Sequence, residues 1–370
     1  MRILQRAATL CFAATLSLSC VAQHKSPLAI YIKEDAPVLM LDHVRVIDGT
    51  GAAPQEDMRI LIAGGKITAL QDAKSHGDYP SNAKVLDMTG KTVMPGLVGM
   101  HEHLFYPLPD RPADGLALYA EAADSAPRLY LAGGVTTART GGSLEPYTDL
   151  ELKRAIEAGK IPGPKLDITG PYLEGKGTFA IQMIADLVAH HVAITSTLAI
   201  FETMAGNRPP MERESAALKT LNVEAAREYL TVRASRAEQQ LGQTLLQKEM
   251  LFEHEFVAAG GLLMAGCDPT GYGGVVPGYG DQRNLELLVE AGFTPVEAIR
   301  IASLNGAKYM GKDAEIGSIA PGKAADIVVL GGNPADKIEN VEKVEMVFKD
   351  GVGYDSAALI QSVKGTVGIR

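Results

Sequence analysis

Two histidines separated by one residue, His101 and His103, stand at the end of an apolar run in the segment MPGLVGMHEH. In a β-strand, residues i and i+2 point to the same side, so the two imidazoles project together while Glu102 points away. Imidazole is a common ligand of zinc and related divalent metals. The spacing therefore predicts part of a metal site at a strand end, although a polar strand end without a metal has the same pattern.

A second strand-like run, GGLLMAGCD, ends in Asp268 and leads into a glycine-rich loop. A lone aspartate at such a place is often a turn or helix-capping residue. In a barrel of parallel strands, however, the C-terminal ends of all strands surround one pocket, where Asp268 would face His101 and His103. Strand alternation directs Cys267 to the opposite side, toward the helices, as an inert core thiol.

The elements that must position these residues are strands alternating with helices. Strands are predicted at 93–103, 134–140, 165–171, 192–201 and 260–268, and the longest helical stretch runs from about 212 to 259. This alternation predicts a parallel sheet, closed as a barrel or open. Short strands with turn signals before residue 92 and after residue 314 are typical of a separate β unit.

Composition and charge exclude several classes of protein. The 370 residues include 46% apolar and 21% charged residues and carry a formal net charge of −9, which makes nucleic acid an improbable partner.

Residues 1–22 have the pattern of an export signal, so a periplasmic or secreted protein is expected; lipid anchoring through Cys20 is the less favoured alternative. No later apolar run reaches the length of a membrane-spanning helix.

Five segments together resemble the amidohydrolase superfamily, close to its imidazolonepropionase-like and prolidase-like members: VMPGLVGMHEH, AGGVTTART, AGCDPTGYGG, GFTPVEAIRIASLNGAKYMG and IGSIAPGKAADIVVL. The resemblance implies a (β/α)8 barrel over residues 93–313 and a small β-sandwich built from residues 36–92 and 314–370. It also implies one or two divalent metals, usually zinc, that activate water to hydrolyse an amide, peptide or cyclic-amide C–N bond.

The resemblance assigns roles to three residues by position. His101 and His103 match the metal ligands of the first barrel strand. Asp268 matches the carboxylate of the last strand, which touches the metal and accepts a proton from the attacking water. The implied substrate is therefore a small amide or peptide molecule.

The same resemblance requires a carboxylated lysine or an acid on strand four and one histidine each on strands five and six. None is recognised, because only residues 172–191 separate the matches to strands three and seven. Three βα units of roughly 30 residues each do not fit there. We therefore expect an incomplete barrel of about five strands, one retained metal site and impaired hydrolysis. A non-catalytic binding or assembly subunit and a truncated gene model are the alternatives.

Three weaker candidates for the substrate side of the pocket follow other strands or lie in loops. Arg139 lies at the end of the second strand, Tyr272 lies in TGYGG, and Glu202 directly follows the run at 192–201. Each also has a structural interpretation as a turn, packing or surface residue. Because the junction between the matches to strands three and seven is short, these strands are expected to have unpaired edges. Such edges associate with other chains, which predicts a homo-oligomer.

Overall fold

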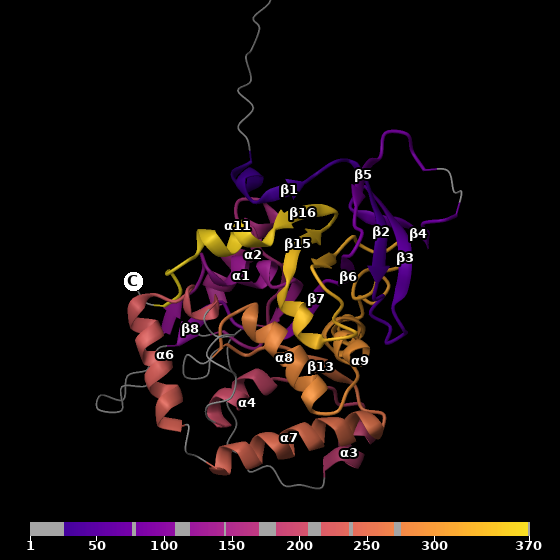
Figure 1. Cartoon of the computed structure of the whole chain (residues 1–370). Helices are drawn as coiled ribbons and strands as arrows, with labels where there is room; N and C mark the ends of the chain where they lie inside the picture. Colours follow the sequence, from indigo (N-terminus) through magenta and orange to yellow (C-terminus); the bar gives the residue numbers. More distant parts are fainter. Residues whose placement is uncertain are drawn as a thin grey trace, which may run out of the picture.

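The computed structural model describes residues 26–75, 79–107, 119–143, 146–169, 183–205, 216–236, 240–269 and 275–368 (Figure 1). The predicted export signal, Cys20 and Tyr272 lie outside the described residues. Among the described helices, none combines the length and apolarity that crossing a membrane requires.

The two ends of the chain form one nine-stranded sheet, with indigo and yellow strands side by side in Figure 1. Its order is β1-β16-β15-β14-β6-β2-β3-β4, and β5 pairs with β2. Strand β6 joins the halves, because it pairs antiparallel with β14 and parallel with β2. The strands are β1 (Ile32–Glu34), β2 (Val38–Val46), β3 (Gln55–Ala63), β4 (Lys66–Asp72), β5 (Lys84–Asp87), β6 (Thr92–Pro95), β14 (Ile327–Leu330), β15 (Val344–Lys349) and β16 (Val352–Asp355).

This sheet has a core of its own. Ile60, Val93, Ile327 and Phe348 are fully buried in one apolar cluster contributed by both chain ends. Burial of such β-branched and aromatic side chains on one face explains why segments so distant in sequence associate. The sequence predicted a small β unit from both ends, and the structure joins it by hydrogen bonds into a single sheet.

The middle of the chain supplies parallel strands. β7 (Leu97–Glu102), β10 (Val135–Thr140) and β11 (Lys165–Asp167) form one ladder in the order β11-β10-β7, while β12 (Ile194–Ser196) pairs with β13 (Leu263–Ala265). Each of the five predicted runs therefore contains a strand, although each strand is shorter than predicted. The run at 93–103 divides in two, since β6 belongs to the nine-stranded sheet and β7 to the parallel ladder. The amide of Asp268 donates a hydrogen bond of 2.9 Å to the carbonyl oxygen of His101 and so connects the two ladders.

One strand prediction is partly wrong. The run at 192–201 was expected to be a single strand, but β12 ends at Ser196 and helix α4 (Leu198–Ala205) begins two residues later. Leu198, Ala199 and Ile200 are almost fully buried. A short apolar run in the interior can be strand or helix, because its periodicity does not distinguish the two.

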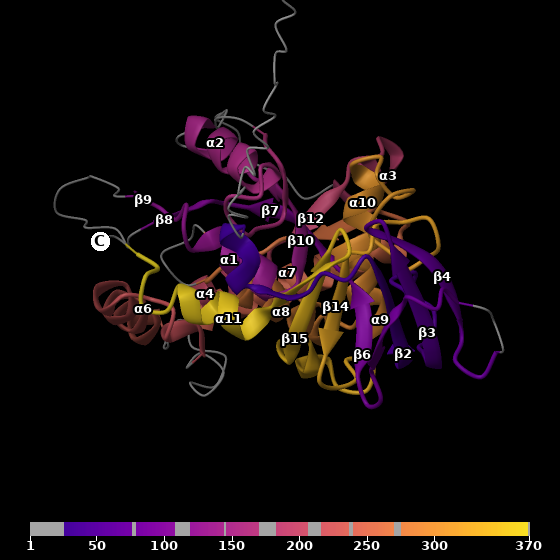
Figure 2. The same cartoon turned by 90° about the horizontal axis from the view of Figure 1, so that it is seen from above.

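Helices surround these strands, and Figure 2 places α6 at the opposite side of the molecule from the strands β2, β3 and β4. The predicted helical stretch at 212–259 contains α6 (Val223–Arg236) and α7 (Gln240–Ala258). The others are α1 (Ala126–Ala132), α2 (Pro146–Glu157), α3 (Met183–Ala189), α8 (Tyr279–Glu290), α9 (Pro295–Arg300), α10 (Gly306–Tyr309) and α11 (Ser356–Ser362). A capping box between Thr294 and Glu297 starts α9, as the sequence predicted.

Candidate metal centre

The structure brings His101, His103 and Asp268 together at the C-terminal ends of β7 and β13. His103 Nε2 lies 3.3 Å from Asp268 Oδ1, and His101 Nε2 lies 3.8 Å from Asp268 Oδ2. One potential ligand atom from each residue lies within 4.8 Å of the others. His103 is fully buried and His101 is half-buried, so the cluster forms at the boundary between the interior and solvent.

The orientation of His103 is fixed by its other ring nitrogen. Nδ1 lies 3.1 Å from the carbonyl oxygen of Gly142, which can only accept a hydrogen bond. Nδ1 must therefore carry a proton, and Nε2 faces Asp268. A backbone carbonyl that fixes the tautomer in this way is typical of histidines that ligate metals. The donor set of two imidazoles and one carboxylate thus fits a divalent metal such as zinc.

Two glycines leave room for His101. A Cβ atom at Gly141 would lie 2.2 Å from His101 Cδ2, and one at Gly266 would lie 2.4 Å from the His101 backbone nitrogen. Real Cβ atoms do not approach so closely, so only glycine permits the observed ring position. Sequence reasoning missed this role of Gly141 and Gly266, because nothing in the local pattern indicates a distant ring.

The electrostatic environment favours neutral His101. Burial lowers the pKa of His101, and the nearby positive charges of His103 and Arg139 lower it further, while Asp268 partly opposes them. A neutral imidazole is the form that binds metal. Asp268 has a backbone φ of 44°, in the left-handed region that aspartate adopts more readily than most residues.

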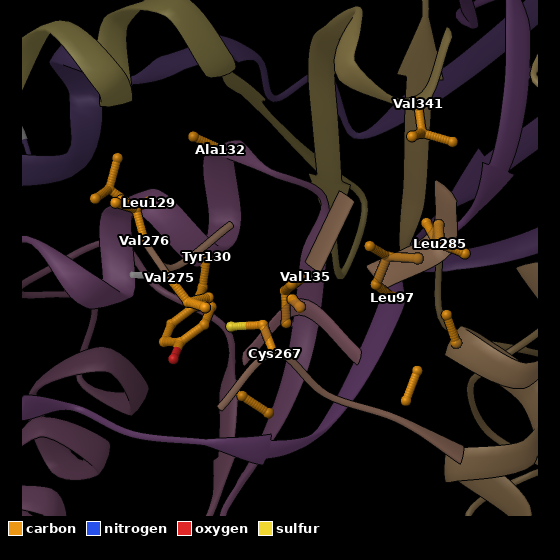
Figure 3. Close-up of a cluster of buried hydrophobic side chains, with 14 of the residues drawn as sticks. Leu97, Leu129, Tyr130, Ala132, Val135, Cys267, Val275, Val276, Leu285 and Val341 are labelled. Carbon is orange, nitrogen blue, oxygen red and sulfur yellow. The ribbon is translucent and has the colours of Figure 1, made fainter. Parts of the chain in front are cut away.

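A second group of ionisable side chains lies on the other side of β7. Glu102, Cys267 and Asp281 are buried, and their potential ligand atoms lie within 4.8 Å of one another. Burial raises the pKa of Glu102 well above its ordinary value and that of Asp281 to about 6. Figure 3 shows Cys267 beside the ring of Tyr130 in the surrounding apolar cluster.

Strand alternation predicted correctly that Cys267 and Glu102 point away from the histidines. It did not reveal that they meet, because the two side chains belong to strands whose pairing only the fold determines. The sequence signal was present nonetheless, since each residue is adjacent to a predicted ligand.

The weaker candidates have different positions. The guanidinium of Arg139 lies 5.8 Å from the ring centre of Tyr309, and its positive charge contributes to lowering the pKa of His101. Glu202 does not join the three-residue cluster; it lies in α4 and forms an ion pair with Arg283 of α8, at 2.8 Å. The predicted strand end at Glu202 is therefore a buried helix position, which explains its pairing with a cation.

Comparisons with known proteins agree with this arrangement. A model of the amidohydrolase family matches residues 256–353, which include β13 and Asp268. The structure of a putative prolidase from Bifidobacterium longum covers 89% of this chain and all of its own, with a TM-score of 0.58 and 24% identity. Molinate hydrolase aligns over 91% of this chain and 98% of its own, with a TM-score of 0.62 and 19% identity. The chain is therefore similar to the amidohydrolase family in sequence over residues 256–353 and to these enzymes in fold over most of its length.

Curated relatives of the chain include adenine deaminases. The enzyme of Ligilactobacillus salivarius (strain UCC118) is 25% identical over 305 residues, which are 80% of this chain and 46% of the relative. Adenine deaminase 2 of Jannaschia sp. (strain CCS1) is 39% identical over 69 residues, or 18% of this chain and 11% of the relative. The chain spans less than half of the length of these relatives. The structural neighbours imply a TIM-barrel-type fold with an additional domain. In this chain the nine-stranded sheet is separate from the ladders of parallel strands.

Proposed function

We propose that this protein is a metal-dependent hydrolase of the amidohydrolase superfamily and acts on a C–N bond. The observation that carries the proposal is the convergence of His103 Nε2 and Asp268 Oδ1 at 3.3 Å, beside His101, at the strand ends where barrel enzymes place their catalytic groups. The match to the amidohydrolase family supports it independently.

His101, His103 and Asp268 would hold one divalent cation, and the donor set favours zinc. When bound, such a cation polarises the substrate carbonyl and lowers the pKa of a bound water to about 7. Asp268 is placed to accept the proton of the attacking water and to pass it to the leaving nitrogen. The carbonyl of Gly142 keeps His103 in one tautomer throughout, and Arg139 would orient a negatively charged part of the substrate.

For the substrate, we propose a small amide, dipeptide or cyclic amide. The similar proteins include enzymes named for deamination and for peptide hydrolysis, an adenine deaminase and an Xaa-Pro dipeptidase. Both reactions replace a C–N bond by a C–O bond through attack of water. Tyr272 and Arg139 are the candidates that would contact the substrate, and Arg139 favours one with a carboxylate.

We further propose that the barrel lacks the strands four to six of the family pattern and retains one metal site. Within the described residues, β11 pairs only with β10 and β12 pairs only with β13. Unpaired strand edges promote association between copies, so a homo-oligomer is expected and light scattering would detect it. The N-terminal pattern supports export, and a non-catalytic assembly subunit is the second candidate function, which the unpaired edges favour.

The test of the proposed hydrolase measures kcat/KM on dipeptides, N-acyl amino acids, cyclic amides and adenine, for the zinc-loaded wild type and two variants. Asp268→Asn should abolish turnover because it removes the proton acceptor, whereas Asp313→Asn, at an exposed aspartate, should not change it. Turnover that survives Asp268→Asn unchanged, or zinc-loaded protein without turnover of any of these substrates, would favour the assembly subunit instead.

A further inference from the structure

On the side of β7 that faces away from the candidate ligands, the carboxyl group of Glu102 connects two strands. Its Oε1 accepts a hydrogen bond from the backbone amide of Cys267 at 3.1 Å, and its Oε2 accepts one from the Cys267 thiol at 3.0 Å. Glu102 stands between His101 and His103 in sequence, and Cys267 directly precedes Asp268. Each of the two hydrogen-bonded residues is therefore a direct sequence neighbour of the candidate ligands.

Further contacts hold this connection in place. The side chains of Asp281, from α8, and Glu102 hydrogen bond, and Asp281 Oδ2 accepts a hydrogen bond from the Gly278 amide at 2.9 Å. Tyr130 Oη donates to the His103 carbonyl at 3.0 Å and accepts from the His103 amide at 3.2 Å. Water does not reach these groups, because Glu102 and Tyr130 are fully buried and Asp281 is 6% exposed.

The backbone makes room for the Glu102 carboxyl group. A Cβ atom at Gly99 would lie 2.5 Å from Glu102 Oε1, so the carboxyl folds back over its own strand in space that only a glycine leaves. Buried polar groups are stable only when hydrogen-bonded, and Glu102 meets this condition through Cys267 and Asp281. The arrangement thus fixes the separation of β7 from the segment that carries Asp268.

We infer that Glu102 is a positioning residue: through Cys267 and Asp281 it sets the geometry of His101 and His103 relative to Asp268. This inference rests on the proposed metal centre. A second cation among Glu102, Cys267 and Asp281 is the competing interpretation. The geometry favours the positioning role, because each of these groups is already hydrogen-bonded to another and a cation would have to displace those bonds.

The test compares Glu102→Gln with Glu102→Ala in the full-length protein, with Co²⁺ as the probe metal. The glutamine keeps an oxygen for the Cys267 amide and an N–H for Asp281, whereas alanine keeps neither. Outer contacts of ligating histidines commonly change metal affinity by about 10- to 100-fold, and we expect a loss of this size for Glu102→Ala, with a shifted visible Co²⁺ spectrum. Glu102→Gln should retain the wild-type affinity and spectrum.

A control separates positioning from general stability. Ile60→Ala removes a fully buried side chain from the nine-stranded sheet and should lower the melting temperature without changing Co²⁺ affinity. Where Glu102→Ala fails to fold, Glu102→Met serves instead, because it fills a similar space and offers no carboxyl oxygen to the Cys267 amide or to Asp281. A Co²⁺ affinity and spectrum unchanged in the folded alanine variant, or a glutamine variant as impaired as the alanine one, would overturn the inference. Two equivalents of Co²⁺ in wild type, one of them lost in Glu102→Gln, would establish the competing cation site.

A readout that needs no metal separates this inference from the proposed function. Nitrogen-15 NMR signals of the His101 and His103 rings report their tautomer and surroundings in the metal-free protein. We expect Glu102→Ala to shift them and Glu102→Gln to preserve them. Wild type that binds no Co²⁺ would refute the proposed metal centre, and the ring signals would still decide whether Glu102 positions the histidines.

Discussion

The amide of Asp268 donates a hydrogen bond of 2.9 Å to the carbonyl oxygen of His101, and the side chains of the same two residues approach to 3.8 Å. One pair of residues therefore joins the two parallel ladders and also builds the candidate metal centre. Any displacement of β13 along β7 would change both contacts together. The metal centre and the strand pairing are consequently expected to depend on each other.

The first prediction concerns metal stoichiometry. Two imidazoles and one carboxylate suffice for one zinc ion with an open coordination position, so we expect at most about one tightly bound equivalent per chain. The double variant His101→Ala, His103→Ala should lose it. Elemental analysis after dialysis makes the measurement, with His190→Ala, an exposed histidine after α3, as the control that keeps its metal. Two tightly bound equivalents in wild type would contradict the single site.

The second prediction concerns the space beside His101. Gly141→Ala places a methyl group where Cδ2 and Nε2 of the ring now lie, at 2.2 and 2.4 Å, and must displace the imidazole. We expect zinc affinity to fall by about 10-fold or more, with a smaller loss of thermal stability. In the control, Gly331→Ala, the new methyl group meets the flexible carboxyl end of Glu345, which can move away. Equal zinc affinities in the two variants would show that the His101 ring is not held where the structure places it.

Individual residues show how far the sequence could be interpreted. The period-two spacing of His101 and His103 and the strand end at Asp268 predicted the cluster, because strand alternation and a parallel fold determine which side chains share an edge. Gly141, Tyr130 and Asp281 could not be found in this way. Their contacts join segments that are distant in sequence. The packing of these segments depends on the whole fold and cannot be predicted from local periodicity. The change from β12 to α4 was missed for a related reason, since both lie in one short, mostly apolar run at 192–201.

The third prediction concerns the pH dependence of stability. Glu253 of α7 is buried behind β12, and burial raises its pKa from 4.5 to about 8, while a hydrogen bond with Ser196 partly opposes the shift. The folded protein therefore binds the proton more tightly than the unfolded chain. Its free energy of unfolding should fall as the pH rises from about 4.5 to about 8, by a few kcal/mol at most.

The variant Glu253→Gln isolates this effect. It removes the titration and keeps a polar group for Ser196, so it should be more stable than wild type at pH 8 and close to wild type at pH 5. Urea denaturation at the two pH values measures the difference, and Glu255→Gln, an exposed neighbour on the same helix, should follow wild type at both. If the free energy of unfolding of Glu253→Gln equalled that of wild type at both pH values, Glu253 would not be a buried carboxyl group with a raised pKa.

The last prediction concerns catalysis by the incomplete barrel that we propose. Asp268 and the two histidines supply a proton acceptor and metal ligands, but a large rate also requires a substrate held in place and a developing oxyanion stabilised in a closed pocket. In the family pattern, strands four to six and their loops form much of that wall. Inserting three βα units from a complete relative between β11 and β12 should therefore raise kcat/KM on dipeptides and N-acyl amino acids by orders of magnitude. The comparison includes the 370-residue chain, the extended chain and Asp268→Asn in both. Equal rates for the two chains, each lost on Asp268→Asn, would mean that the three ligands suffice and that the absent strands contribute nothing to catalysis.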